Sequence, residues 1–279
     1  MRRRRGTRQA WVGGGVLAVL LVAVFVAPWL AGVDPYATDL GVRLEPPSAA
    51  HPLGRDALGR DLLARLCLGG RVSLAVAACA VSLALALGVL VGAVAGWRGG
   101  WTDALLSRVI DVFLAFPGLL LAIALTAVLG PSLRHVVVAL AALGWTGYAR
   151  LTRAHVASAK HRDFVEAAGA LGVGGVGIVR RHVLPGAAPL LLVQATFGLS
   201  AVIVAEASLS FLGLGAAPPT PSWGGMLDEG RLFMLVAPHA MLVPATALAV
   251  TVVALQTLGD GLRDLLDVPD RRQRWHVGQ

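Results

Sequence analysis

Long runs of apolar residues, separated by short polar segments, constrain the fold of this chain more than any other feature. A transmembrane helix needs roughly 20 consecutive apolar residues, and most of the runs reach that length. The run that starts at Val136 is shorter, and it spans a bilayer only if Arg134 and Arg150 extend their charged ends toward the membrane surfaces. We therefore predict an all-α integral membrane protein with six transmembrane helices. The runs occupy residues 11–33, 72–96, 106–129, 136–148, 187–209 and 234–257.

The composition is too apolar for a soluble domain, since 56% of the 279 residues are hydrophobic and only 14% are charged. The net charge of +8 comes almost entirely from arginine, because Lys160 is the only lysine. These arginines are scattered at the ends of the apolar runs, which is typical of residues that face anionic lipid and set the topology. We therefore expect the lipid membrane, and no nucleic acid, as a partner.

The distribution of lysine and arginine predicts a multi-pass protein of the cytoplasmic membrane with both chain ends in the cytoplasm. With that orientation the inner segments hold 17 basic residues and the outer ones 7. The first outer loop is the exception, because it carries five arginines. The first apolar run is too long for a cleaved signal peptide, so we interpret it as a retained helix. We divide the chain into residues 1–71, with the N-terminus, first helix and external loop, and a membrane core at 72–279.

Two outer segments have compositions of their own. The first contains the repeat GRDALGRD at residues 54–61, which we interpret as a turn before an amphipathic helix at the membrane surface. That helix is expected from about Ala57 to Leu68, with salt-bridged arginines. The second segment, residues 210–231, is stiffened by prolines and predicted to turn at Gly224-Gly225. Such a segment either caps the outer mouth of a pathway or connects two helices.

The sequence lacks the residue patterns of an enzyme. It contains no GxxxxGK[ST] phosphate-binding loop, and its seven histidines have no metal-ligand spacing. Gly198-Leu199-Ser200 falls short of the nucleophile elbow of a hydrolase. We predict no catalytic residue, no metal site and no bound cofactor in this chain.

Acidic residues inside apolar runs are rare and costly, which makes them candidates for functional sites. Asp111 lies in the third run, about one helical turn from Arg108, and we favour a local ion pair between them near the inner boundary. Glu206 lies in the fifth run with no partner within one helical turn. Both acids are therefore candidates for helix pairing or for lining a pathway.

Residues 163–185, in a loop at about 161–185, form a polar segment that the charge distribution places in the cytoplasm. The pattern predicts a short helix from which Glu166 projects, while Ala167-Ala168 lets another backbone come close. Glycines from Gly172 onward end the helix and allow a sharp turn, and Leu184-Pro185 starts the next span. A docking helix and an amphipathic connector that rests on lipid fit this pattern equally well. The apolar side expected to lie along the membrane consists of Phe164, Val165, Ala168 and Leu171.

One spacing in this segment, Glu166-Ala167-Ala168, then Gly172, then Leu184-Pro185, resembles the EAA signature of ABC importer permeases. In that family the loop forms a coupling helix that docks into a cleft of the ATP-binding subunit, so the resemblance implies ATPase coupling for these residues. Five ordered stretches between His51 and Leu227 resemble the dipeptide, oligopeptide and nickel permease family, and most of all its C-type subunit. They are HPLGRDALGRDLLARLCLGGRVSL, RVIDVFLAFPGLLLA, DFVEAAGALG, RRHVLPG and EASLSFLGLGAAPPTPSWGGML.

The resemblance implies a type I ABC importer permease fold and a set of partners. These are a second homologous permease subunit, two ATP-binding subunits that hold ATP and Mg, and an extracytoplasmic solute-binding protein. The chain is then a transport subunit, not an enzyme, and moves dipeptides or oligopeptides across the cytoplasmic membrane. A nickel-complex or glutathione-like solute is the alternative within the family. From the residues alone, an ion-coupled secondary transporter and a scaffold protein also stay open.

Overall fold

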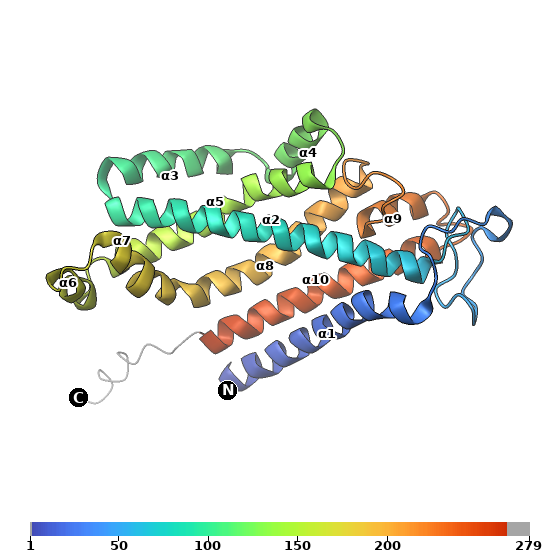
Figure 1. Cartoon of the computed structure of the whole chain (residues 1–279), viewed down its shortest axis with the longest axis horizontal. Coiled ribbons are helices and arrows are strands. Elements are labelled where there is room, and N and C mark those ends of the chain that lie inside the picture. The colour runs from blue at the N-terminus through green and yellow to red at the C-terminus, as the bar shows by residue number, and fades with distance from the viewer. Residues whose placement is uncertain (1, 267–279) are drawn as a thin grey trace.

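The apolar runs form long helices that lie side by side along the molecule (Figure 1). The computed structural model describes residues 2–266, and every named element within them is helical, which confirms the predicted all-α class. Three arginines of the inner charge count, at positions 271, 272 and 274, lie outside the described residues. The long helices are α1 (Arg2–Ala31), α2 (Leu62–Arg98), α3 (Gly100–Ala115), α4 (Gly118–Leu129), α5 (Leu133–Ala159), α8 (Leu184–Phe211) and α10 (His239–Leu266). The short ones are η1 (Leu40–Val42), α6 (Asp163–Ala170), α7 (Gly175–Ile178), the π-helical turn η2 (Val179–Val183) and α9 (Trp223–Arg231).

Helix length and apolarity support four or five of the six predicted spans. Four stretches of the described chain are long and apolar enough to cross a membrane, namely residues 6–26, 62–98, 175–211 and 239–266. α3 and α4 make a fifth if they form one span, although the chain bends by 84° between them. The bend falls at Pro117, which cannot donate a helix hydrogen bond. α5 does not meet the same criterion.

α2 and α5 pack more closely than side chains normally allow, through three glycines spaced four residues apart on α2. A Cβ atom at Gly88 would lie 2.6 Å from the carbonyl oxygen of Trp145, and one at Gly96 would lie 2.6 Å from that of Arg153. Gly92, between them, faces the carbonyl oxygen of Ala149 in the same way. Small residues at this spacing let two membrane helices bring their backbones together. The sequence segment GVLVGAVAG therefore marks the main helix contact of the core.

Two groups of shorter elements lie at opposite ends of the bundle. Figure 1 shows α6 and α7 at one end, and α9 with the loop between α1 and α2 at the other. α1 runs beside α10, and a Cβ atom at Gly13 would lie 2.7 Å from the carbonyl oxygen of Ala254. The N-terminal helix is thus attached to the bundle mainly through α10.

Two segments that the charge distribution predicts on the outer side differ from their predicted form. The predicted surface helix from about Ala57 to Leu68 is wrong, because the helix begins at Leu62, is capped by Asp61, and continues as α2 for 37 residues. The division drawn at residue 71 accordingly falls inside α2. The turn predicted at Gly224-Gly225 is also wrong, since both glycines lie in α9. Gly224 instead allows close packing, as a Cβ atom there would lie 2.6 Å from the Cα of Ala207.

Candidate functional site

The short helix α6 follows α5 directly and has the features of a stable helix start. The carbonyl oxygen of Arg162 accepts hydrogen bonds from the backbone N–H groups of Val165, at 2.9 Å, and Glu166, at 3.4 Å. Asp163 and Glu166 place negative charge in the first turn, where the helix dipole favours it. The structure thus has a helix where the EAA-like residues predicted one.

One side of α6 packs into the protein. Val165 and Ala168 are buried in an apolar cluster with residues of α2, α5 and the segment after α6. Phe164 and Leu171, which were expected on the same apolar side, are instead 42% and 85% exposed. The four residues of the predicted apolar face therefore lie on two sides of α6. Val165 and Ala168 hold the helix to the bundle, whereas Phe164 and Leu171 are exposed. The other members of the cluster are Ala93, Val156, Ala159, Ile178 and Val183, with Trp97, Val173, Val179 and Leu184 packed against them.

The other side of α6 is exposed and carries small residues. Glu166, Ala167, Gly169 and Ala170 are all exposed. A Cβ atom at Gly169 would have no heavy atom within 4 Å, so the surface beside it is open. Among the side chains that the structure describes, Glu166 forms no salt bridge. A backbone from another subunit has room to approach this face.

α6 ends in a Schellman turn at Gly172. The Gly172 N–H donates a 2.9 Å hydrogen bond to the carbonyl oxygen of Gly169, and the Val173 N–H donates a 3.1 Å bond to that of Ala168. Gly172 has φ +81°, a conformation that glycine adopts without steric cost. A Cβ atom at Gly172 would meet nothing within 4 Å, so the backbone conformation alone calls for glycine.

α8 begins at Leu184 with Pro185 in its first turn, as predicted, but the segment before it is also helical and continuous with α8. α7, η2 and α8 form one helical stretch over residues 175–211. Within η2 the Leu184 N–H bonds to the carbonyl oxygen of Val179, one residue further back than in an α-helix. This π-helical turn lies directly before Pro185, whose missing N–H disturbs the regular pattern. Leu184 touches the cluster beneath α6, whereas Pro185 is exposed.

Two polar contacts that the sequence pattern did not reveal hold the helices around α6. Lys160, at the end of α5, donates a 2.8 Å hydrogen bond from Nζ to the carbonyl oxygen of Trp97, and its ammonium group lies 5.8 Å from the centre of the Trp97 ring. Arg153 of α5 forms an ion pair with Asp103 of α3, with Nη2 2.7 Å from Oδ2. The ends of α2, α3 and α5 are therefore joined beside the exposed helix.

Glu206 lies at the other end of the molecule and is fully buried, with 0% exposure. Its Oε1 accepts a 2.7 Å hydrogen bond from Ser210, one helical turn away, so the expectation of no partner within one turn is wrong. Ser73 of α2 and Ser222, just before α9, also approach the carboxyl group. The Trp223 N–H donates a 3.2 Å hydrogen bond to Ser73 Oγ, which joins α9 to α2 beside Glu206.

Asp111 is exposed on α3, and so is Arg108. The favoured ion pair between them is absent, since none of the described salt bridges includes either residue. The structure thus does not bring Asp111 together with Glu206 or with α6. Residues 2–266 also contain no group of three His, Cys, Asp or Glu side chains arranged to hold a metal ion.

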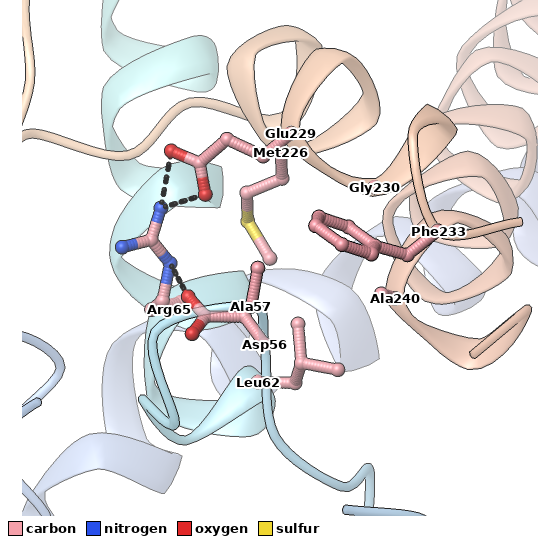
Figure 2. Close-up of a pocket in the computed structure, with 9 residues that line it drawn as sticks. All are labelled: Asp56, Ala57, Leu62, Arg65, Met226, Glu229, Gly230, Phe233 and Ala240. Carbon is pink, nitrogen blue, oxygen red and sulfur yellow. Dashed lines mark hydrogen bonds and ion pairs between the residues drawn. The ribbon is translucent and has the colours of Figure 1, made fainter. Parts of the chain in front are cut away.

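A buried charge cluster joins the loop between α1 and α2 to α9, and Figure 2 shows its central residue, Arg65, between Asp56 and Glu229. Arg65 is 1% exposed, with Nε 3.2 Å from Asp56 Oδ2 and Nη2 2.9 Å from Glu229 Oε2. Arg60 pairs with the same two carboxylates, at 2.6 and 2.8 Å. The arginines of this region are salt-bridged as predicted, and two of them, Arg60 and Arg65, are buried inside the protein. Their shared partner Glu229 comes from a distant helix, α9.

Comparison with known proteins gives two family matches. Residues 88–269 match the family described as binding-protein-dependent transport system inner membrane component. Residues 1–47 match the N-terminal TM domain of oligopeptide transport permease C. The glutathione transport system permease protein GsiD of Salmonella paratyphi A is 47% identical over 268 residues, which cover 95% of this chain and 88% of that protein. GsiD of Escherichia coli O6:K15:H31 is 42% identical over 267 residues, with the same coverage.

Solved structures show the same fold. A chain of the MetNI methionine ABC transporter, in an inward facing conformation, superposes with a TM-score of 0.53 at 21% identity, covering 70% of this chain and 93% of that chain. A second crystal form of MetNI gives a TM-score of 0.52 at 22% identity. The first family match spans α6 and most of the helical core. The resemblance read from the EAA-like residues is therefore confirmed, and the chain belongs to the binding-protein-dependent transport system inner membrane components, as an ABC importer permease of the oligopeptide family.

Proposed function

We propose that this chain is the C-type permease subunit of an ATP-driven importer that moves short peptides, glutathione among them, across the cytoplasmic membrane. The relatives support the solute class, since glutathione permeases are 42–47% identical over 95% of this chain. The match of residues 1–47 to oligopeptide transport permease C supports the same class. A nickel-complex solute has no comparable support among these relatives.

The observation that best supports this mechanism is that α6 has one exposed side and one side buried against the bundle. Its exposed side offers Glu166, Ala167 and an open surface at Gly169 to a partner, as a docking helix requires. Its buried side, Val165 and Ala168, is packed against α2, α5 and the helical segment that follows α6. In the proposed complex Glu166 is a polar anchor and Ala167 allows the partner to come close, whereas the buried Ala168 seats α6 on the bundle and Gly172 aims the helix.

A movement of α6 in this arrangement would carry the inner ends of several helices with it. The apolar cluster beneath α6 includes Ala93 of α2, Val156 of α5 and Val183 of η2. The Lys160–Trp97 contact adds a second connection between α5 and α2. Closure of the ATPase dimer therefore acts on a connected group of helix ends, and a rigid-body shift of this group would switch the bundle between inward-facing and outward-facing states. Leu184 and Pro185 lie at the junction of η2 and α8, so they would transmit this shift to α8.

The proposed topology is a type I permease fold with six spans, both chain ends inside and α6 in the cytoplasm. α3 and α4 together form one bent span, and α5 forms another. α5 is able to cross the membrane despite its lower apolarity because Gly88, Gly92 and Gly96 let it pack directly on α2. The placement of α6 and α9 at opposite ends of the bundle agrees with this topology.

The proposed partners are a second homologous permease subunit, two ATP-binding subunits and an extracytoplasmic solute-binding protein. ATP and Mg are bound by the ATP-binding subunits, and this chain contributes no cofactor. Glu206 serves helix pairing, because it is fully buried and lies beside Ser73 of α2 and Ser222 before α9. Asp111 is exposed on α3 and stays a candidate for the pathway or for pairing with another subunit.

Uptake by the reconstituted importer tests this function. The chain is assembled with its partner permease, ATPases and binding protein in proteoliposomes, and uptake of labelled glutathione, a dipeptide and a nickel complex is measured. We expect ATP-dependent accumulation of the peptides, abolished when the ATPases are omitted. Accumulation that persists without ATPases and collapses with an ionophore would establish an ion-coupled transporter instead. Transport of the nickel complex alone would exclude the peptide assignment while preserving the permease role.

A further inference from the structure

An open groove lies between the inner end of α2 and the segment that follows α6. Its volume is about 440 Å³, and its wall consists mostly of apolar side chains. Two of them, Leu90 and Val176, are 64% and 85% exposed, so the groove opens to the outside of the chain. The residues from α2 are Ala86, Val89, Leu90, Ala93, Val94, Trp97 and Arg98, and those from α7, η2 and α8 are Val176, Val179, Arg180 and Leu184.

Two arginines are the only charged residues of this groove. Arg98 and Arg180 come from its two different walls, and both are exposed. Neither forms a salt bridge within the described part of the chain. The groove thus combines an apolar trough with two positive charges that have no acidic partner.

The groove also matches one membrane leaflet in position and length. Arg98 is the last residue of α2, and Arg180 lies in the second turn of the helical stretch that begins at Gly175, so both arginines lie near the ends of long apolar helices. From Arg98 to Ala86 the α2 helix rises about 18 Å. One leaflet of the hydrocarbon core measures roughly 15 Å, half of the usual total. Trp97 lies beside Arg98, as aromatic residues commonly do at the membrane interface.

We propose that this groove binds one anionic phospholipid, with its phosphate at Arg98 and Arg180 and an acyl chain along the apolar trough toward Ala86. Basic pockets between membrane helices on the cytoplasmic side are suited to anionic headgroups. An apolar helix of a partner subunit would cover the trough but leave both arginines without a counter-charge. An anionic phospholipid would do both, because its acyl chain covers the apolar side chains and its phosphate pairs with the two arginines.

Such a lipid would contact α7 and η2, the helical segment that follows α6. Val176, Val179 and Arg180 belong to α7 and η2, which directly follow the Schellman turn of α6. The bound lipid therefore lies between α2 and the segment that the proposed movement of α6 displaces. The lipid site itself depends only on the membrane location of the chain.

Quenching of Trp97 fluorescence tests the proposal, because this residue lines the groove. The assembled importer is placed in phosphatidylcholine membranes that contain an equal minor fraction of brominated phosphatidylglycerol or brominated phosphatidylcholine. The Trp97 signal is obtained as the difference between the wild type and Trp97→Phe. We expect stronger quenching by the anionic lipid, with a preference of about thirtyfold for two basic side chains at a membrane surface. Arg98→Gln with Arg180→Gln should reduce that preference to the level of phosphatidylcholine.

The matched control is Arg108→Gln, which removes an exposed arginine of α3 outside the groove and should leave the preference unchanged. Native mass spectrometry of the same complexes, which counts retained phosphatidylglycerol, should show one lipid fewer in the double variant only. Equal quenching by both lipids in the wild type would overturn the proposal, since it indicates ordinary surrounding lipid. Absence of quenching by either would also overturn it, because a partner subunit or water then fills the groove.

Discussion

The backbone N–H of Val173 donates a 3.1 Å hydrogen bond to the carbonyl oxygen of Ala168, across the turn that ends α6. The same turn brings the Val173 side chain against the buried cluster that contains Ala168. Both contacts depend on Gly172, which has φ +81° between them. The direction of the exposed helix face is thus set by one left-handed residue.

Replacing Gly172 should impair coupling without unfolding the chain. Gly172→Val forces a β-branched residue into the left-handed region, which costs about 1–2 kcal/mol and favours another backbone path. We expect ATP-dependent uptake to fall on the order of tenfold at normal membrane abundance. The matched control is Gly174→Val, because Gly174 has φ −65° and ψ 153°, a region that valine prefers. Equal ATP-dependent uptake by the two variants would show that coupling does not depend on the turn at Gly172.

Reversing the charge of Glu166 should separate the permease from its ATPases. Glu166→Lys places a cation in the first turn of α6, which costs the helix only about 0.3–1 kcal/mol, too little to unfold the protein. We expect loss of ATPase subunits on co-purification and loss of uptake. Asp260→Lys makes the same charge change at an exposed position of α10 and should leave both intact. Normal ATPase retention and uptake by Glu166→Lys would show that α6 docks nothing through this residue.

A methyl group added at Gly92 should destabilise the core. The Cβ of Gly92→Ala meets the Ala149 carbonyl oxygen of α5 and lies 2.8 Å from the Thr152 Cβ, so the helices must separate. Overpacking of this kind costs about 1–3 kcal/mol. We expect a lower Tm for the purified protein in detergent. Gly118→Ala is the control, because a Cβ there meets nothing within 4 Å, and its Tm should not fall.

Removing Arg65 should be more damaging than removing an exposed arginine of the same region. Arg65→Met leaves the buried Asp56 with one counter-charge fewer, and breaking a buried pair costs about 3–5 kcal/mol. Arg231→Met breaks an ion pair with Asp228 whose side chains are 53% and 35% exposed, and such pairs contribute at most about 1 kcal/mol. Thermal unfolding of both purified variants gives the comparison. A Tm for Arg65→Met as high as that for Arg231→Met would contradict a structural role for the cluster.

Cysteine labelling should place α6 and the first loop on opposite sides of the membrane. Leu171 and Leu40 are 85% and 66% exposed, so each can be replaced by cysteine after the native Cys67 and Cys79 are changed to serine. We expect Leu40→Cys to react with a membrane-impermeant maleimide in intact cells. Leu171→Cys should react only after permeabilisation. Labelling of Leu171→Cys in intact cells would invert the proposed topology.

Much of the membrane architecture and the position of α6 could be predicted from the sequence, because both depend on local patterns. A run of apolar residues spans the bilayer whatever its neighbours are, since its backbone must satisfy its own hydrogen bonds. Glu166, Ala167, Ala168 and Gly172 act within one short helix and its cap, so their spacing alone indicated the helix and its end. Family membership followed from the same local signatures.

Only the tertiary structure decided which helices pair and which charges are buried. The packing of Gly92 on Ala149, the pairing of Arg65 with Glu229 and the burial of Glu206 join residues from distant parts of the chain. A hydropathy value depends only on the residue type. It is therefore the same for a solvent-exposed arginine and for an arginine buried against carboxylates from another helix. The bend at Pro117 and the split of the apolar face of α6 likewise depend on what each helix packs against. The sequence therefore determined which segments become helices and where α6 ends, and three-dimensional packing determined which faces are left for partners and lipid.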